Sequence, residues 1–185
     1  MIRLRRLIKT PRRLARSKGF GVHSPFAYSF IRDTIRCRNS YYAYTAIEEL
    51  AYKSECRESD LKLVFRIACR FDITRFAVYG KEAAVLKQVL SLTRHDSECV
   101  ATDCDSVPQM AVADCSTELT SEETAQLRRT VSAGGVVVLI NAPRISNTLA
   151  RVTAGMTRGM SFAGRRTAIV AGFSYLPRQH FDIII

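Results

Sequence analysis

Apolar residues recur at helical spacing through the first 70 residues of the chain. Ser24 and Pro25 form an N-cap residue followed by a proline at the first helical position, and four apolar side chains follow them at helical spacing. Ser59 is expected to cap the last helix of this region. The three predicted helices cover residues 25–37, 44–53 and 61–71.

Short apolar runs bounded by turn residues dominate the pattern beyond residue 72, and helical periodicity separates most of them. The run VVVLI is the strongest strand signal, and Thr120 with Glu123 forms a capping box. Because strands alternate with helices, the pattern predicts an α/β fold with a parallel sheet. The predicted strands cover residues 75–79, 98–102, 110–113, 136–140, 160–163, 167–173 and 181–185, and the helices residues 82–92, 120–133 and 146–156.

The last two apolar runs differ from the others in how they are connected. Only residues 174–180 join them, which is too short for a helical crossover. We therefore expect residues 167–173 and 181–185 to pair with each other as antiparallel strands.

Charge divides the chain into a basic arm and a nearly balanced body. The 185 residues carry a net charge of +11, and eight of the 28 Lys and Arg residues lie within the first 18 positions, which contain no acid. The remaining chain therefore carries only +3. This distribution argues against intrinsic disorder and against a highly basic nucleic-acid-binding body. We expect a basic arm at residues 1–18, a helical cap at 19–72 and an α/β domain at 73–185.

The sequence also predicts a cytoplasmic protein without a membrane span. No apolar run approaches the roughly 18–20 residues that cross a bilayer. The Arg-rich start lacks the apolar core of a secretory signal, although an organellar transit peptide has a similar composition. The six cysteines form no C-x-x-C pair and are interpreted as reduced thiols, with convergence of Cys99, Cys104 and Cys115 on a metal as the alternative.

Two stretches resemble bacterial class I S-adenosylmethionine-dependent methyltransferase-like proteins. GFGVHSPFAY at residues 19–28 is similar to the segment that opens the helical cap of that family, and LKLVFRIACRF at 61–71 resembles the helix before its first strand. GGVVVLINAPR and the stretch from Met160 to the end are similar to the family's fifth strand and terminal hairpin. The resemblance implies a three-layer Rossmann-like fold with strand order 3-2-1-4-5-7-6 and an antiparallel C-terminal strand. It places the cofactor over the carboxyl ends of strands 1, 2 and 4.

The resemblance assigns two residues to S-adenosylmethionine binding. The family's first loop reads E-x-G-x-x-x-G, but here Val78 and Tyr79 precede Gly80 and no second glycine follows. Asp103 lies 23 residues beyond Gly80, where an acid after the second strand accepts hydrogen bonds from ribose hydroxyls. Asp105 is an alternative for this role, and an ordinary turn residue is the other interpretation of both.

One unit of the family's sheet has no counterpart in the sequence. Only residues 104–109 lie between the second strand and the MAVAD run, too few for a helical crossover. We therefore expect that strand 3, the edge strand in the order 3-2-1-4-5-7-6, is missing from this chain. The loops that form the adenine pocket of the family would be lost with it.

Asp114, through the resemblance, and His23, through its own chemistry near a helix start, are the candidate catalytic residues. Asp114 matches an aspartate that helps to hold a divalent cation in metal-dependent relatives, but Asn141-Ala142 stands where their second acidic pair would lie. A hard cation needs several oxygen ligands, so we expect no metal. His23 is a possible general base, or alternatively a structural histidine that fixes the entry to the cap by hydrogen bonding.

Two functions follow as expectations. The first is a methyltransferase family member whose S-adenosylmethionine binding is weak or lost. The second is a non-catalytic binding or scaffold protein whose residues 1–18 contact nucleic acid or an anionic membrane surface, with a merely solvated basic tail as the alternative.

Overall fold

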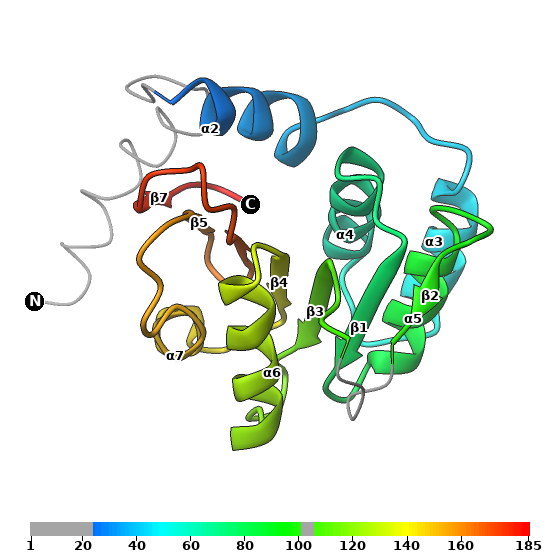
Figure 1. Cartoon of the computed structure of the whole chain (residues 1–185). Helices are drawn as coiled ribbons and strands as arrows, with labels where there is room; N and C mark the ends of the chain where they lie inside the picture. Colours follow the sequence, from blue (N-terminus) through cyan, green and yellow to red (C-terminus); the bar gives the residue numbers. More distant parts are fainter. Residues whose placement is uncertain (1–23, 101–105) are drawn as a thin grey trace, which may run out of the picture.

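The structure is a computed structural model that describes residues 24–100 and 106–185. In this part of the chain one seven-stranded sheet, parallel at most of its pairings, forms the centre of the molecule (Figure 1). The strand order is β2-β1-β3-β4-β6-β5-β7. The strands are β1 (Arg75–Tyr79), β2 (Glu98–Cys99), β3 (Met110–Asp114), β4 (Val136–Ile140), β5 (Met160–Ala163), β6 (Ala168–Ala171) and β7 (Gln179–Asp182).

Helices cover both faces of this sheet, so the described chain has three layers. One face packs against the N-terminal helices and the helix that follows β1, and the other face packs against the two later helices. The first group comprises α2 (Pro25–Phe30), the π-helix η1 (Ile31–Ile35), α3 (Tyr44–Tyr52), α4 (Glu58–Arg70) and α5 (Ala83–Ser91), and the second α6 (Ser121–Ser132) and α7 (Ile145–Val152). No described helix is long and apolar enough to cross a membrane.

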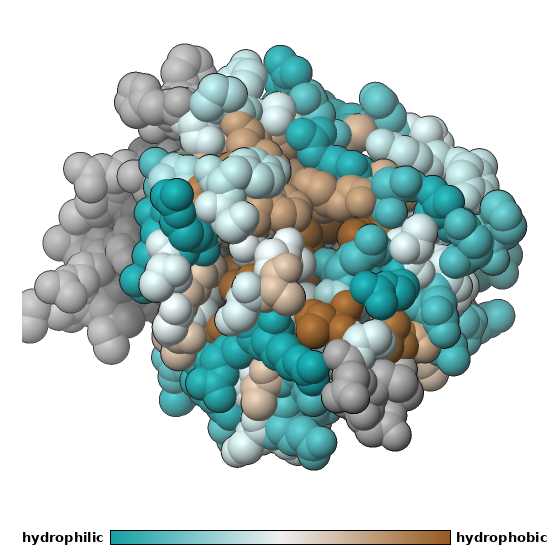
Figure 2. All heavy atoms as spheres, viewed as in Figure 1, coloured by the Kyte–Doolittle hydropathy of each residue, from teal (hydrophilic) through white to brown (hydrophobic). Residues whose placement is uncertain are grey.

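Aromatic rings join the N-terminal helices to the sheet. The Phe30 ring lies 5.1 Å from the ring of Phe162 on β5, and the Phe26 ring lies 5.9 Å from that of Phe173 after β6. Phe71, at the end of α4, contacts both Phe30 and Phe173. The helices that precede β1 therefore share one core with the sheet, and Figure 2 shows apolar surface between α2 and α4.

Capping determines where several helices begin. The Ser24 hydroxyl accepts a hydrogen bond from the Ala27 amide, and Thr120 with Glu123 forms the complete capping box, as predicted. The prediction for the third helix was wrong, because Ser59 does not cap it and lies in its first turn. Arg57 takes the N-cap position with an extended backbone, and its side chain pairs with Asp60 in that first turn.

The order of six strands agrees with the order expected after loss of an edge strand. The predicted antiparallel pairing of the last two runs was wrong, and so was the expected antiparallel C-terminal strand, because the antiparallel strand is β6 and the last strand, β7, runs parallel to its neighbour. β6 pairs antiparallel with both β4 and β5, while β7 pairs parallel with the outer edge of β5. The reason is the tight turn between β5 and β6, in which the Gly164 amide donates to the Thr167 carbonyl. Since β6 then has a neighbour on each side, the last run pairs with the free edge of β5.

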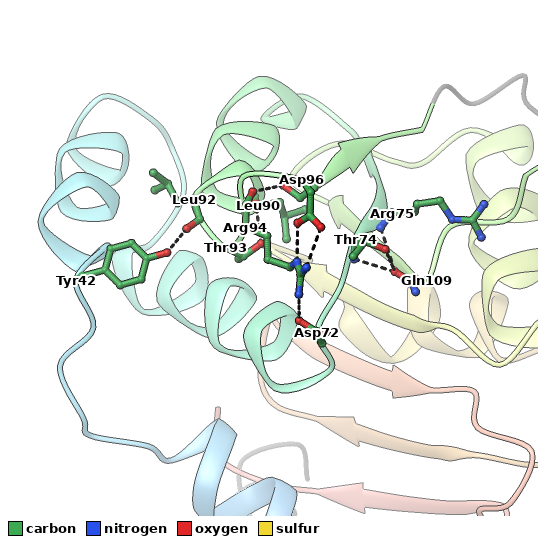
Figure 3. A network of polar contacts seen from close by, with 11 residues as sticks. Tyr42, Asp72, Thr74, Arg75, Leu90, Leu92, Thr93, Arg94, Asp96 and Gln109 are labelled. Atoms are coloured by element: carbon green, nitrogen blue, oxygen red, sulfur yellow. Dashed lines mark hydrogen bonds and ion pairs between the residues drawn. The ribbon is translucent and has the colours of Figure 1, made fainter.

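The connection from β2 to β3 is short, and residues 106–109 contain no helix. Gln109 fixes the end of this connection at the amino ends of the strands (Figure 3). Its Oε1 accepts hydrogen bonds from the Thr74 amide at 2.8 Å, the Thr74 hydroxyl at 3.0 Å and the Arg75 amide at 3.0 Å. One side chain thereby holds the start of β1 against the start of β3.

Arg94 braces the same end of the sheet beside β2. Its guanidinium forms ion pairs with Asp72, before β1, and with Asp96, before β2 (Figure 3). These ion pairs and the Gln109 contacts make up what we call the amino rim. All of its side-chain bonds lie at the solvent-exposed surface.

Candidate functional site

The candidate site lies at the opposite end of the sheet, where β1, β3 and β4 end. Parallel pairing places Tyr79 beside Ala113 and Asp114 beside Ile140, so the residues that follow these strands meet at one edge. Ligands of open α/β sheets bind at this carboxyl edge. We refer to the residues that follow β1, β3 and β4, together with the β5–β6 turn and residues 52–57, as the carboxyl rim.

Gly80 allows β1 and β3 to approach each other closely at this rim. Its φ is +86°, a left-handed conformation that side chains rarely adopt. A Cβ atom at this position would lie 2.1 Å from the carbonyl oxygen of Asp114. Glycine is therefore required here by the packing of the protein's own backbone, whether or not a ligand binds.

Asp114 is fully buried, with 0% of its surface exposed. Its Oδ1 accepts hydrogen bonds from the Asn141 side-chain amide at 3.0 Å and from the Ser116 amide at 3.3 Å. Its Oδ2 accepts a hydrogen bond from the Ser116 hydroxyl at 2.7 Å. Both carboxylate oxygens are thus occupied by groups of the chain itself, as burial of a charged group requires.

Asn141 connects Asp114 to the segment between α3 and α4. It follows β4 directly, is 2% exposed and adopts a φ of +57°, which asparagine tolerates better than most residues. Its side-chain amide also contacts the Cys56 sulfur at 3.7 Å. Burial, together with the nearby carboxylates of Asp114 and Glu82, raises the pKa of the Cys56 thiol to about 12. Cys56 therefore stays a protonated thiol at neutral pH and acts as a small packing residue.

Three consecutive residues of that segment attach to three different parts of the rim. The Glu55 carboxylate pairs with Lys81, just after Gly80, at 2.7 Å. Cys56 contacts Asn141. The Arg57 guanidinium donates to the Thr167 hydroxyl in the β5–β6 turn at 3.1 Å, which places residues 55–57 along the ends of β1 and β4 and the start of β6.

Thr167 and Asp60 hold residues 55–57 in place through hydrogen bonds. The Thr167 hydroxyl donates to the Asp60 carboxylate at 3.0 Å, and the second oxygen of that carboxylate accepts from Arg57 at 2.9 Å. Asp60 and Thr167 are both buried. A buried carboxylate held by two donors makes it costly for the segment to move away from the rim.

Of the four predicted site residues, the structure brings Gly80 and Asp114 together. His23 and Asp103 lie outside the described residues, as do Asp105, Cys104 and the basic arm. Among the residues that are described, no group of three or more His, Cys, Asp or Glu side chains is arranged to hold a metal ion.

The described rim residues do not fit S-adenosylmethionine as the resemblance would place it. The position for the acidic residue of the first loop is taken by Val78 or Tyr79, and Tyr79 is buried. Gly80 has its Cβ position filled by the Asp114 backbone. Asp114 itself has no carboxylate oxygen left without a donor.

Asn141 and Cys56, which complete the site, were not predicted from the sequence as site residues. Asn141 was considered only because it stands where metal-dependent relatives have an acid. An asparagine directly after the strongest strand is, however, a signal for a left-handed turn, and this signal could have identified it. Cys56 carries no local signal, because its partner lies 85 positions away along the chain.

A second cluster of polar side chains lies between α7 and the β5–β7 edge, where a hollow of about 480 Å³ opens. The Ser161 hydroxyl hydrogen bonds to His180 Nδ1 at 2.9 Å, and His180 Nε2 lies 3.7 Å from the Asp182 carboxylate. The parallel register that places Ser161 opposite His180 produces this pair. Because the pair joins β5 to β7, it has a direct role in holding the edge strand.

No family model, curated protein or solved structure matches this chain.

Proposed function

We propose that the chain is a class I methyltransferase family member that has lost S-adenosylmethionine binding and acts as a non-catalytic binding protein. The proposed family assignment rests on the strand order, because removing the edge strand from the family order gives β2-β1-β3-β4-β6-β5. It also rests on the GVHSPF segment at residues 21–26 and on the antiparallel placement of β6. Fold alone does not carry activity, so the loss of cofactor binding is argued from the site.

The observation that carries the proposal is the closed hydrogen bonding of Asp114. A carboxylate that serves a cofactor or substrate must present an oxygen to it, whereas this one is fully buried and has both oxygens hydrogen bonded to Asn141 and Ser116. Freeing an oxygen would leave a buried donor of the protein unpaired, which costs roughly 1–3 kcal/mol. The same contacts would have to be broken again in every binding event.

The short connection before β3 supports the same conclusion. Ten residues separate Cys99 from Met110, and β2 has only two residues. The family builds its adenine pocket from the loops around the strand that is missing here. A cofactor held only at its ribose and methionine parts would lose the contacts that position its base.

Calorimetric titration of the full chain with S-adenosylmethionine and S-adenosylhomocysteine tests the proposal. We expect no saturable heat and no shift in melting temperature at millimolar ligand, because a ligand that binds only the folded state raises its stability. Saturable binding with one ligand per chain would overturn the loss of cofactor binding.

If S-adenosylmethionine does bind, a pair of variants identifies which acid after β2 contacts its ribose. Asp103→Ala would abolish that binding if the acid after β2 contacts the ribose as the family resemblance implies, whereas Asp105→Ala would abolish it if the neighbouring acid does. Asp182→Ala, at the opposite edge of the sheet, is the matched control.

A further inference from the structure

Several Lys and Arg side chains of the carboxyl rim have no acidic partner among the contacts described above. Lys53, Arg144 and Arg165 are exposed, and each is without an ion pair in the part of the chain that the structure describes. Arg166 is exposed as well and donates only to the backbone carbonyl of Asn141, at 3.3 Å. Four positive charges are thus presented to solvent at this one edge.

Backbone hydrogen bonds hold three of these arginines close to one another in the fold. The Ala142 amide donates to the Arg166 carbonyl at 2.9 Å, so the β5–β6 turn lies against the residues that follow β4. Arg165 belongs to that turn, and Arg144 lies two residues beyond Ala142. The guanidinium groups therefore extend from two adjoining loops.

The acids of the same rim are mostly neutralised or buried. Glu55 is paired with Lys81, and Asp60 is buried with Arg57 and Thr167. Asp114 is buried as well, the exposed Glu118 is paired with Arg151, and Glu82 is partly exposed. The rim surface is therefore positive, although residues 19–185 as a whole carry only +3.

Polar side chains line a hollow of about 380 Å³ beside these arginines. Arg144 and Arg151 lie at its wall together with Ser116, Asn147 and Thr148. Arg151 is paired with Glu118, which also lines the hollow, whereas Arg144 has no ion pair with another described residue. Guanidinium, hydroxyl and amide groups are the side chains that hydrogen bond to phosphate and sugar oxygens of nucleic acids.

Tyr52 provides an exposed aromatic ring three residues before Glu55, whose ion pair with Lys81 attaches this segment to the rim. It ends α3, immediately before Lys53, and is 92% exposed. Tyr42 and Tyr175 are also exposed, but Tyr42 donates to the Leu92 carbonyl and Tyr175 stacks on Phe173. Tyr52 makes no such contact with the described residues, so its ring faces are available for stacking.

We propose that the carboxyl rim binds a single-stranded nucleic acid, with Arg144, Arg165 and Arg166 on its phosphates and Tyr52 stacked on a base. Positive grooves combined with exposed aromatic rings are the common means of binding single strands. An anionic membrane would call for an apolar patch beside the charges, and Tyr52 is the one large apolar side chain that the described rim exposes. This proposal is independent of the cofactor titration, because it names a different ligand and different side chains.

Fluorescence anisotropy with a labelled single-stranded RNA oligonucleotide and the full chain tests the proposal. We expect Arg144→Ala with Arg165→Ala to weaken binding at least about fivefold and to reduce the slope of log K against log salt by about 1.4, since two phosphate contacts are lost. Tyr52→Ala should weaken binding about tenfold, while Tyr52→Phe keeps the ring and binds as the wild type.

Arg158→Ala is the matched control, because Arg158 is also exposed and has no ion pair within residues 24–100 and 106–185, but it precedes β5 at the amino edge of the sheet. The basic arm is present in every variant, so differences among them report the rim. An equal loss in Arg158→Ala and in the rim variant would overturn the proposal, as would unchanged binding by the rim variant. Absence of RNA and DNA binding together with sedimentation on phosphatidylserine vesicles would assign the rim to membranes instead. Circular dichroism melts establish that each variant is folded.

Discussion

The two ends of the sheet are built from similar polar side chains but in opposite ways. At the amino rim, Gln109 and Arg94 make their hydrogen bonds and ion pairs at the exposed surface. At the carboxyl rim, Asp114, Asn141 and Cys56 are 0%, 2% and 5% exposed. Water can replace a lost partner at the first end, but it has no ready access to the second.

This difference shows which polar groups the fold depends on. Removing one partner from a buried carboxylate leaves a desolvated charge, whereas removing one from a surface pair exchanges it for water. The carboxyl rim is therefore both the site expected for function and the part of the fold least able to rearrange. We expect substitutions there to be costly and matched substitutions at the amino rim to be mild.

Gly80→Ala should give the largest effect. The added Cβ would lie 2.1 Å from the Asp114 carbonyl oxygen, and strand pairing fixes the backbone on both sides of this contact. We expect a loss of at least about 3 kcal/mol in the free energy of unfolding, measured by urea denaturation.

Gly155→Ala is the control for the backbone angle alone. Gly155 has a φ of +81°, close to that of Gly80, but nothing lies within 4 Å of its Cβ position. We expect a cost of about 1–2 kcal/mol from the left-handed conformation. Equal costs at the two glycines would show that the close approach of β1 and β3 contributes nothing.

Asn141→Gly should give the next largest effect at the carboxyl rim. Glycine keeps the positive φ of +57° but removes the donor to Asp114 and the contact with Cys56. We expect a loss of about 1–3 kcal/mol, because the buried carboxylate keeps only its contacts with Ser116. Chemical denaturation with a maleimide assay of Cys56 measures both consequences.

The thiol assay gives the outcome that would contradict this prediction. Cys56 should react slowly in the wild type, since its thiol is buried and protonated. It should react faster in Asn141→Gly, because residues 55–57 lose a contact that holds them on the rim and the thiol becomes more exposed. A rate unchanged by the substitution would mean that Asn141 does not help to keep residues 55–57 on the rim.

The part of the fold that the sequence predicted well is the part governed by local pattern. Three strands, β1, β4 and β5, coincide with their predicted ranges because continuous apolar runs mark strands buried on both faces. The capping box at Thr120 was found for the same reason, since its residues are three positions apart. Neither result required knowledge of what packs against these elements.

The rest depends on contacts between distant segments. The position of β7 follows from which sheet edge stays free, and that is decided by the β5–β6 turn. The start of α4 follows from Arg57 and Asp60 meeting Thr167, more than 100 positions away. The candidate site was half predicted, because Gly80 and Asp114 end strands, while Cys56 reaches them only through the tertiary fold.

Gln109→Ala tests the expectation that substitutions at the amino rim lower the free energy of unfolding only slightly. One side-chain oxygen accepts three hydrogen bonds from Thr74 and Arg75, but it does so at the surface. We expect a loss of about 1 kcal/mol, because water takes over part of the bonding. Gln109→Glu keeps an acceptor oxygen and should unfold like the wild type. A cost for Gln109→Ala as large as that of Asn141→Gly would remove the contrast between the two rims.

Arg94→Ala should give the smallest effect, and its pH dependence identifies the cause. The hydrogen bonds from Arg94 lower the pKa of Asp96 to about 2, below its value in the unfolded chain. A carboxyl whose pKa is lowered on folding stabilises the protein above its unfolded pKa of about 4, and that contribution is lost as the pH falls through about 2. The difference in melting temperature between the wild type and Arg94→Ala should therefore be largest near neutral pH and shrink steadily below pH about 4. The melting temperature of Arg94→Lys, which keeps the charge but not the planar guanidinium group, should fall between those of the wild type and Arg94→Ala.

A difference in melting temperature that persists undiminished in acid would contradict this explanation. It would mean that the aliphatic part of Arg94 stabilises the amino rim by packing, and that the ion pairs drawn in Figure 3 contribute nothing measurable.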